Sequence, residues 1–256
     1  MKKTITLAIF LIAVFTLFPQ TKKQTGNETN NSFSQAKKLL SKVVYSSDDV
    51  RKTFYCDCGY DTKNKIKSEG CSYHDSKRGG RSGRVEWEHI VPAAAFGGML
   101  PEWRSGHPNC VDSKGKSFKG RNCASKLNKK FQYMQADMYN LVPAIGKVNA
   151  DRSNFSYGII SGEAREYGAC DFEIKNRVAE PREAIRGDIA RTYFYMDSAY
   201  PEFELVNSKN RALFEAWDKA DPVDRWECKR GKIIESVQKN RNLILEKACT
   251  SAFGSY

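Results

Sequence analysis

The sequence predicts a mainly helical α+β fold in a single disulfide-bridged domain. Three segments in the second half of the 256-residue chain carry apolar residues at helical spacing, whereas strand-like runs are few and short. Eight cysteines follow an apolar N-terminal run of the kind that directs export, and an even number favours disulfides. With 40% apolar and 28% charged residues, the composition is ordinary for one globular domain.

Residues 1–20 are expected to be a signal peptide or an N-terminal anchor. Met1-Lys2-Lys3 precedes the uncharged run Ile5–Phe18, which is shorter than the roughly 20 residues of a membrane span. A small-x-small cleavage pattern does not follow, so an uncleaved anchor remains the alternative; a cleaved signal predicts no stable membrane association. Residues 21–32 are polar and predict a flexible linker, and residues 33–251 form the expected domain.

The cysteines are predicted to pair in the oxidising compartment that an export signal implies. Proximity in the sequence favours Cys58 with Cys71 and Cys110 with Cys123. A structural zinc site is the alternative, but Cys56-Asp57-Cys58 lacks the paired C-x-x-C spacing of such sites. The full set is Cys56, Cys58, Cys71, Cys110, Cys123, Cys170, Cys228 and Cys249.

The elements are expected in the following order. Ser34 caps a first helix whose apolar positions run from Ala36 to Val44, and residues 54–83 form an irregular, disulfide-tied segment. Residues 85–91 form a short strand that Pro92 stops, and residues 97–122, rich in glycine and proline, form a long loop.

A second group of helices follows this loop. Ser125 opens a helix with apolar residues at 127, 131, 134, 138 and 141, which Pro143 ends, with Asp137 and Asn140 on a neighbouring polar face. Further helices are expected over 181–198 and 210–220, and one more after the N-cap Asp221 and Pro222.

The formal charge of +12 is unevenly distributed. The stretch 113–136 holds seven basic residues and no acidic residue, and a second basic cluster at 77–84 leads directly into Glu86. Solvated surface cations are the simpler explanation of one such run. Two runs beside one acidic motif favour a polyanionic substrate.

That motif, Arg84-Val85-Glu86-Trp87-Glu88-His89-Ile90-Val91-Pro92, combines two carboxylates with a histidine. Carboxylate oxygens can hold a hard divalent cation, and a neutral imidazole can accept a proton from water. Alternation along a strand places Glu86 and Glu88 on one face, but it directs His89 to the other unless the strand bends there. A buried structural histidine beside two surface glutamates is the alternative.

Several motifs together resemble the periplasmic or secreted endonuclease I family of Gram-negative bacteria. They are the stretch 84–92, then 136–146 (ADMYNLVPAIG), 148–155 (VNADRSNF), 190–193 (ARTY) and 222–228 (PVDRWEC), in that order along the chain. The resemblance covers about residues 32–249, and it implies a ββα-metal (His-Me finger) nuclease core.

The family pattern also implies roles for individual residues. His89 is the expected general base, Glu88 and Asn140 the ligands of one Mg²⁺, Arg121 a phosphate clamp and Glu86 an outer support of the metal site. Mn²⁺ or Ca²⁺ could occupy the same site. Tyr139 and Gln135 differ from the histidine and glutamate found in relatives, so neither receives a role.

Other polar residues are expected to act around this centre. The turn containing Asn149, Asp151, Arg152, Ser153 and Asn154 is expected to support the site through hydrogen bonds. Contacts to the nucleic-acid backbone are expected from Lys126, Lys129, Lys130 and Arg191.

The sequence thus predicts an exported, monomeric, Mg²⁺-dependent endonuclease without a small-molecule cofactor. It would cleave DNA, with RNA as an alternative substrate, with little sequence preference and leave 5′-phosphate ends. Two other functions remain open: an exported non-catalytic nucleic-acid-binding or DNA-uptake protein, and a phosphodiesterase for small nucleotides.

Overall fold

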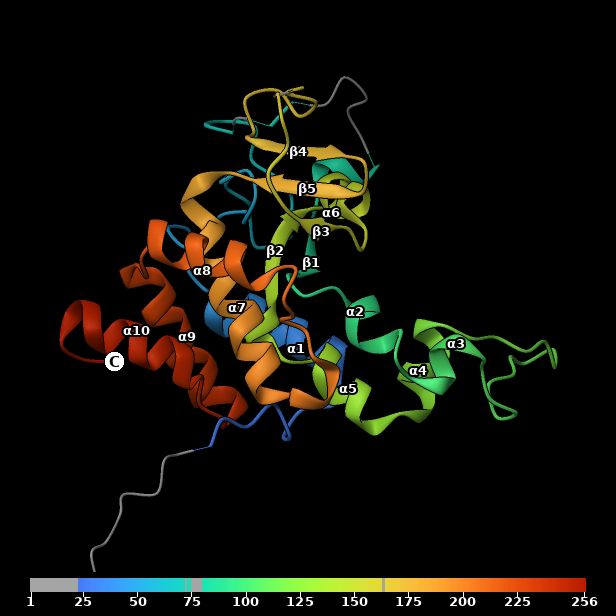
Figure 1. The fold of residues 1–256 in the computed structure, drawn as a ribbon. Coiled ribbons are helices and arrows are strands. Elements are labelled where there is room, and N and C mark those ends of the chain that lie inside the picture. Colours follow the sequence, from blue (N-terminus) through green and yellow to red (C-terminus); the bar gives the residue numbers. More distant parts are fainter. Residues whose placement is uncertain (1–22, 72, 75–79, 163) are drawn as a thin grey trace, which may run out of the picture.

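A computed structural model describes residues 23–71, 73–74, 80–162 and 164–256, so the predicted signal peptide lies outside the described residues. Helices dominate and the sheets are small, which confirms the mainly helical α+β class (Figure 1). The α-helices are α1 (Phe33–Leu39), α2 (Ala93–Gly97), α3 (Pro101–Arg104), α4 (Arg121–Leu127), α5 (Lys129–Gln135), α6 (Gly146–Arg152), α7 (Arg186–Ala199), α8 (Arg211–Ala220), α9 (Arg225–Gln238) and α10 (Leu243–Phe253). The part of the chain that is described contains no helix long and apolar enough to span a bilayer.

Shorter helical turns and five strands complete the architecture. The turns are the π-helix η1 (Leu40–Val44) and the 3₁₀ helices η2 (Gly80–Gly83), η3 (Met138–Asn140), η4 (Glu183–Ile185) and η5 (Pro201–Phe203). The strands are β1 (Val85–His89), β2 (Leu141–Ile145), β3 (Ser156–Tyr157), β4 (Phe172–Lys175) and β5 (Val178–Pro181). The last three form a sheet of order β3-β5-β4, with β3 parallel and β4 antiparallel to β5.

A ββα unit lies at the centre of the fold (Figure 1). Strand β1 pairs antiparallel with β2, from Val85 opposite Ile145 to His89 opposite Leu141. Helix α6 follows β2 directly and packs against both strands. All five residues of β2 are buried, so this unit joins the motif at 84–92 to the hydrophobic core.

The long helix expected from Ser125 to Leu141 is broken in the structure. Asn128 has an extended backbone, and its side chain accepts from the Phe131 N–H to cap α5. Asp137 caps η3 in the same way. Because Asn and Asp offer the backbone such hydrogen bonds, the apolar 4-3-4-3 spacing continues while the helix does not. Pro143 accordingly lies within β2, where a two-stranded sheet tolerates it.

Two other predicted boundaries also shift. Ser32 rather than Ser34 caps α1, and Asp224 rather than Asp221 caps α9, because each side chain accepts an N–H from the first turn of its helix. Part of the predicted loop 97–122 forms the short helix α3.

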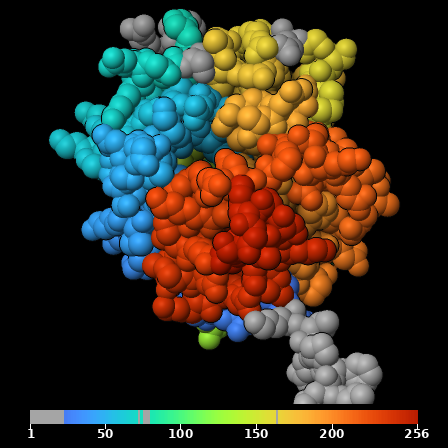
Figure 2. Space-filling model, turned by 90° about the vertical axis from the view of Figure 1, so that its left-hand side faces the viewer, coloured from blue at the N-terminus to red at the C-terminus, as the bar shows by residue number. Residues whose placement is uncertain are grey.

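Residues 24–30 are held against the domain, although their polar composition predicted a flexible linker. Asn27 is 1% exposed; its backbone N–H donates to the Tyr200 hydroxyl, and its side chain donates to the Tyr133 carbonyl (2.9 Å). The Thr29 hydroxyl donates to the carbonyl of Gln238 (2.6 Å). Figure 2 shows the neighbouring face, where the last helices, in red, lie beside blue segments of the N-terminal quarter.

All eight cysteines form disulfides, which excludes the zinc alternative. The two pairs favoured by proximity, Cys58–Cys71 and Cys110–Cys123, are confirmed. Cys56–Cys170 ties the irregular segment to the region before β4, and Cys228–Cys249 joins α9 to α10. Such cross-links stabilise the fold mainly by restricting the unfolded chain.

Candidate active site

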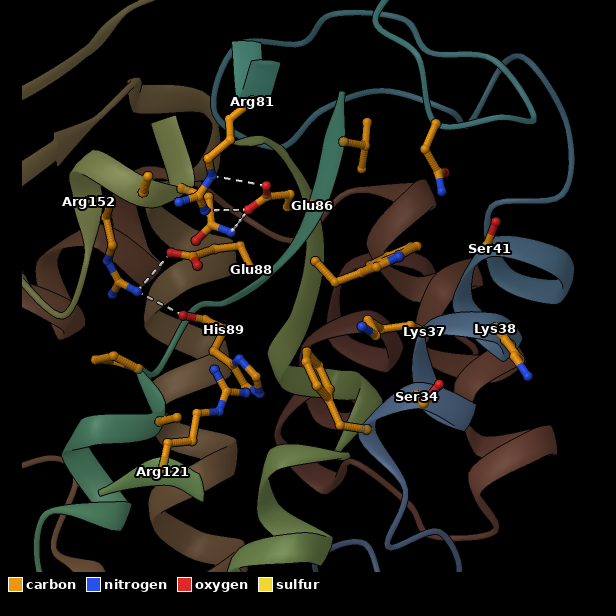
Figure 3. A pocket seen from close by; sticks show the side chains of 18 of the residues that line it. Ser34, Lys37, Lys38, Ser41, Arg81, Glu86, Glu88, His89, Arg121 and Arg152 are labelled. Carbon is orange, nitrogen blue, oxygen red and sulfur yellow. Dashed lines mark hydrogen bonds and ion pairs between the residues drawn. The ribbon is translucent and has the colours of Figure 1, made fainter. Parts of the chain in front are cut away.

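A cavity of about 740 Å³ opens beside β1, and four predicted site residues line it: Glu86, Glu88, His89 and Arg121. Strand β1, helix α6 and the start of α4 form one wall, and α1 with η1 forms the other (Figure 3). Both glutamates of β1 reach the same cavity, as the alternation of strand side chains predicts.

His89 also faces this cavity, because β1 ends at His89 and the chain bends immediately afterwards. Its Nε2 lies 2.9 Å from the Gln135 carbonyl oxygen. A carbonyl can only accept, so Nε2 carries the proton and Nδ1 is left as an acceptor. Burial and the nearby Arg121 charge lower the pKa of His89 to about 3, against the hydrogen bond to Gln135. The imidazole is therefore neutral at physiological pH.

Glu88 is a buried carboxylate held by two donors. The Tyr55 hydroxyl (3.1 Å) and Arg152 Nη1 (2.9 Å) both donate to its Oε1. Burial raises the pKa of Glu88, although Arg152 and Tyr55 oppose this shift. Arg152 is fully buried and also donates to the carbonyls of His89 (2.8 Å) and Ile90 (2.7 Å). The support expected from Arg152 is thus present, and it fixes the end of β1.

Arg121, the first residue of α4, brings a guanidinium close to the imidazole. Its Cζ lies 5.1 Å from the centre of the Phe33 ring, and the same ring lies 5.0 Å from that of His89. Its Nη2 is buried and has no hydrogen-bond partner within the described chain. Burial lowers the pKa of Arg121, against the attraction of Glu88. A buried donor without an acceptor is costly, so this position favours an anionic ligand.

Two asparagines, from the motifs at 136–146 and 148–155, have different partners in the structure. Asn140 is fully buried; its Oδ1 accepts from the Val91 N–H (2.7 Å) and its Nδ2 donates to the Val91 carbonyl (3.0 Å). Asn149 on α6 lines the cavity, and its Nδ2 donates to Glu86 Oε2 (3.2 Å). Since a carboxylate can only accept, this contact orients the amide and leaves its Oδ1 as an acceptor. The cavity therefore receives Asn149 and not the predicted Asn140.

Glu86 lies in a set of ion pairs at the rim of the cavity. It accepts from Arg81 Nε and Arg84 Nη2, each at 3.0 Å, as well as from Asn149. Burial acts to raise the pKa of Glu86, but the hydrogen bonds from Arg81 and Arg84 outweigh it and lower the pKa. A Cβ on Gly146 would come within 2.8 Å of Glu86 Oε1, so glycine permits the close approach of α6. Glu86 thus orients Asn149.

Comparison with known proteins shows the family. The model of the endonuclease I family matches residues 15–249. The chain belongs to the endonuclease I family. It is 40% identical to an extracellular deoxyribonuclease of Aeromonas hydrophila over 85% of this chain and 89% of the relative. Identity is 39% to a periplasmic deoxyribonuclease of Aeromonas hydrophila, over 85% of this chain and 86% of the relative. It is 37% to Endonuclease-1 of Buchnera aphidicola subsp. Acyrthosiphon pisum, over 87% of this chain and 83% of the relative.

Membership of the endonuclease I family confirms the resemblance seen in the sequence and makes the protein a nuclease, that is, a hydrolase. The extracellular and periplasmic relatives, together with four disulfides, place the protein in the periplasm or outside the cell, as predicted.

Arg191 does not occupy the position that the sequence predicted for a nucleic-acid contact. Its side chain is 3% exposed and forms ion pairs with Glu227 (2.6 Å) and Asp218 (2.9 Å), which join α7 to α9 and α8. A guanidinium enclosed by carboxylates cannot also bind phosphates. This prediction is wrong, because the helical pattern does not show which face of α7 the C-terminal helices cover.

The predicted contacts Lys126, Lys129 and Lys130 are exposed but do not line the cavity of this endonuclease I domain. Lys126 Nζ donates to the carbonyl of Asn109 (2.7 Å), and Lys130 Nζ lies 3.0 Å from a Glu202 carboxylate oxygen. That these lysines contact nucleic acid stays a prediction, and such contacts would lie on the surface outside the cavity.

Sequence reasoning missed the cations of the opposite wall. Lys37, Lys38 and Lys42, from α1 and η1, line the cavity. A signal for them was present, since they lie between the apolar positions of the predicted first helix and hence on its outer face.

Proposed function

We propose that the protein is an exported, Mg²⁺-dependent endonuclease that hydrolyses phosphodiester bonds in DNA with little sequence preference. One observation carries the proposal: a neutral imidazole with Nδ1 as its acceptor and a buried guanidinium, whose Nη2 has no partner among the described residues, line the same cavity as Glu88. The Aeromonas relatives are named deoxyribonucleases, which supports DNA as the substrate.

Glu88 and Asn149 are the residues that would hold the metal ion. A carboxylate has about four acceptor sites, and the contacts on Glu88 Oε1 leave capacity for a cation. The oriented amide of Asn149 supplies a second oxygen, the donor type that Mg²⁺ prefers. When bound, Mg²⁺ would neutralise charge on the phosphoryl and leaving oxygens, and Mn²⁺ or Ca²⁺ could replace it.

The chain's own groups then perform the proton and charge steps. His89 Nδ1 accepts a proton from the water that attacks phosphorus, while the Gln135 carbonyl keeps the second ring nitrogen protonated. Arg121 donates to a non-bridging phosphate oxygen and stabilises the charge that develops there. Departure of the 3′ oxygen leaves a 5′-phosphate on the other product. Arg152 holds Glu88 in place throughout.

Plasmid nicking tests the proposal directly. Supercoiled DNA should be nicked in Mg²⁺ and remain intact in EDTA, and the nicked product should religate without kinase treatment because its 5′ ends carry phosphate. Metal-independent binding without nicking would instead identify a non-catalytic nucleic-acid-binding or uptake protein.

Substrate comparison tests the remaining alternatives. DNA and RNA strands of matched sequence should show faster cleavage of DNA, and a dinucleotide should be a poor substrate. Equal or better cleavage of the dinucleotide would favour a phosphodiesterase for small nucleotides.

A further inference from the structure

We propose that the face of α1 and η1 carrying Lys37, Lys38 and Lys42 is the second wall of the substrate cleft and binds phosphates flanking the scissile one. The inference rests on the proposed nuclease function and names the substrate contact of the same site. Lys37, Lys38 and Lys42 line the same cavity as Glu88, His89 and Arg121. Figure 3 shows Lys37 and Lys38 on α1, across from these three residues, with Lys37 directed toward the interior of the cavity.

The α1–η1 segment is amphipathic, and burial of its apolar side determines which residues face the cavity. Its buried positions, Ala36, Leu40 and Val44, follow each other at intervals of four and pack into the core. Polar residues on the other side of the segment line the cavity: Ser34, Lys37, Lys38, Ser41 and Lys42. The apolar stripe therefore anchors the segment, and the opposite stripe presents three ammonium and two hydroxyl donors.

These lysines differ in their partners from three arginines near β1, namely Arg81, Arg84 and Arg152. Arg81 and Arg84 pair with Glu86, and Arg152 pairs with Glu88. No carboxylate among the described residues forms an ion pair with Lys37, Lys38 or Lys42, so their charge is left for a ligand. An uncompensated positive wall in a cleft attracts a polyanion.

Lys37 connects this wall to the catalytic residues. Its Nζ lies 4.6 Å from the centre of the Phe33 ring, which also contacts Arg121 and His89. A strand whose scissile phosphate lies at Arg121 would therefore carry its neighbouring phosphates along α1.

The cavity composition favours an extended backbone over a compact ligand. Small-molecule pockets are mostly apolar with a few polar groups, whereas cations and hydroxyls are prominent in this lining. Lysine ammonium groups act as mobile point charges, and contacts to phosphates carry no sequence information. This agrees with cleavage that has little sequence preference.

The test compares the triple variant Lys37→Gln/Lys38→Gln/Lys42→Gln with the matched variant Lys209→Gln/Lys219→Gln/Lys247→Gln, which removes equal charge from exposed lysines outside the cavity. On a DNA duplex, the first variant should lose 10- to 100-fold in kcat/KM through a higher KM, while cleavage of a dinucleotide stays unchanged. In the inactive His89→Ala background, the slope of log affinity against log salt should become shallower by about 2 to 3, since each phosphate neutralised contributes about 0.9. The matched variant should retain the wild-type slope.

Equal loss on duplex and dinucleotide would overturn the proposal, as would an unchanged slope or the same loss in the matched variant. Lys42→Gln alone changes one exposed side chain and should reduce the slope by about 1, which keeps the test valid if the triple variant folds poorly. Failure of the wild type to cleave any polymer would refute the proposed function, while the slopes would still decide whether this wall binds phosphates.

Discussion

Two buried polar clusters of this molecule differ in how completely their hydrogen bonds are satisfied. In the first, Asp137 accepts at Oδ2 from the hydroxyls of Tyr195 (2.8 Å) and Tyr200 (2.7 Å). At Oδ1 it accepts from the Gln238 amide (2.8 Å) and the backbone N–H of Tyr139 (3.1 Å). Each oxygen thus has two partners, and the cluster ties η3, α7 and α9 together.

The second cluster, beside β1, leaves buried donors without acceptors. Arg121 Nη2 and Arg152 Nε have no partner among the described residues, although Arg152 is otherwise bonded to Glu88 and two carbonyls. Buried polar groups are nearly always paired in folded proteins, so an unpaired cation that lines a cavity indicates a binding site. The contrast separates polar residues that hold the fold from those available for a substrate.

Among the variants of the cluster beside β1, His89→Ala should cause the largest loss of DNA cleavage. Loss of the proton acceptor should reduce DNA cleavage by about 10² to 10⁴-fold or more, the usual contribution of a general base. Affinity for DNA should be nearly unchanged, because phosphates are bound by cations and not by the neutral imidazole. Cleavage and filter-binding assays measure the two quantities, and equal loss of both would mean that His89 is structural.

The two arginines should respond in opposite ways. Arg121→Gln should reduce cleavage by about 100-fold, as removal of a charge-stabilising donor does, with little change in the free energy of unfolding. Arg191→Gln should lower that free energy by about 3 kcal/mol, because Glu227 and Asp218 lose their partner, while DNA affinity persists. Urea unfolding and cleavage rates of both variants provide the comparison. A stable Arg191→Gln protein with weakened DNA binding would restore the original sequence prediction.

The two asparagines provide a finer distinction. Asn149→Ala should reduce Mg²⁺-dependent cleavage by about 10- to 100-fold and raise the Mg²⁺ concentration needed for half-maximal rate, because the cavity loses an oxygen ligand. Asn140→Ala should instead lower the free energy of unfolding by about 2 kcal/mol, since it leaves the buried N–H and carbonyl of Val91 unpaired. Metal titration and urea unfolding separate the two effects; the reverse assignment would identify Asn140 as the ligand.

The sequence could predict the placement of Glu86 and Glu88, because strand alternation is local. The same local rule misdirected His89, since the bend after β1 depends on the contacts of Arg152 and Asn140 with main-chain groups at residues 89–91. The choice between Asn140 and Asn149 also depended on tertiary contacts. Both lie next to apolar runs, and only the packing of α6 on β1 brings one of them to the cavity.

The spacing of apolar residues predicted helix ranges well where no side-chain cap interrupted the helix. Helix α8 closely follows its predicted range. Helix α7 ends near the predicted residue but begins at Arg186, after β5 and η4, rather than at Pro181, and the apolar spacing from 127 to 141 concealed two breaks and a strand. Side-chain caps at Asn128 and Asp137 decided that outcome, and a pattern of apolar residues does not show such hydrogen bonds. Charge runs were a poorer guide, because exposure and ion pairing determine which cations can meet a substrate.

The acid sensitivity of the fold should show the smallest effect. An unfolded histidine has a pKa near 6.5, whereas burial and the Arg121 charge hold that of His89 at about 3. Between these values the unfolded chain binds a proton that the native protein does not. The contribution of His89 to the free energy of unfolding is therefore complete above the unfolded pKa and is lost as pH decreases below it. From pH 7.0 to 5.5, His89 should account for a loss of about 1.3 kcal/mol. Urea unfolding in EDTA at both pH values should show this loss in the wild type and its absence in His89→Gln. The same pH dependence in both proteins would mean that the native state lets His89 take up a proton.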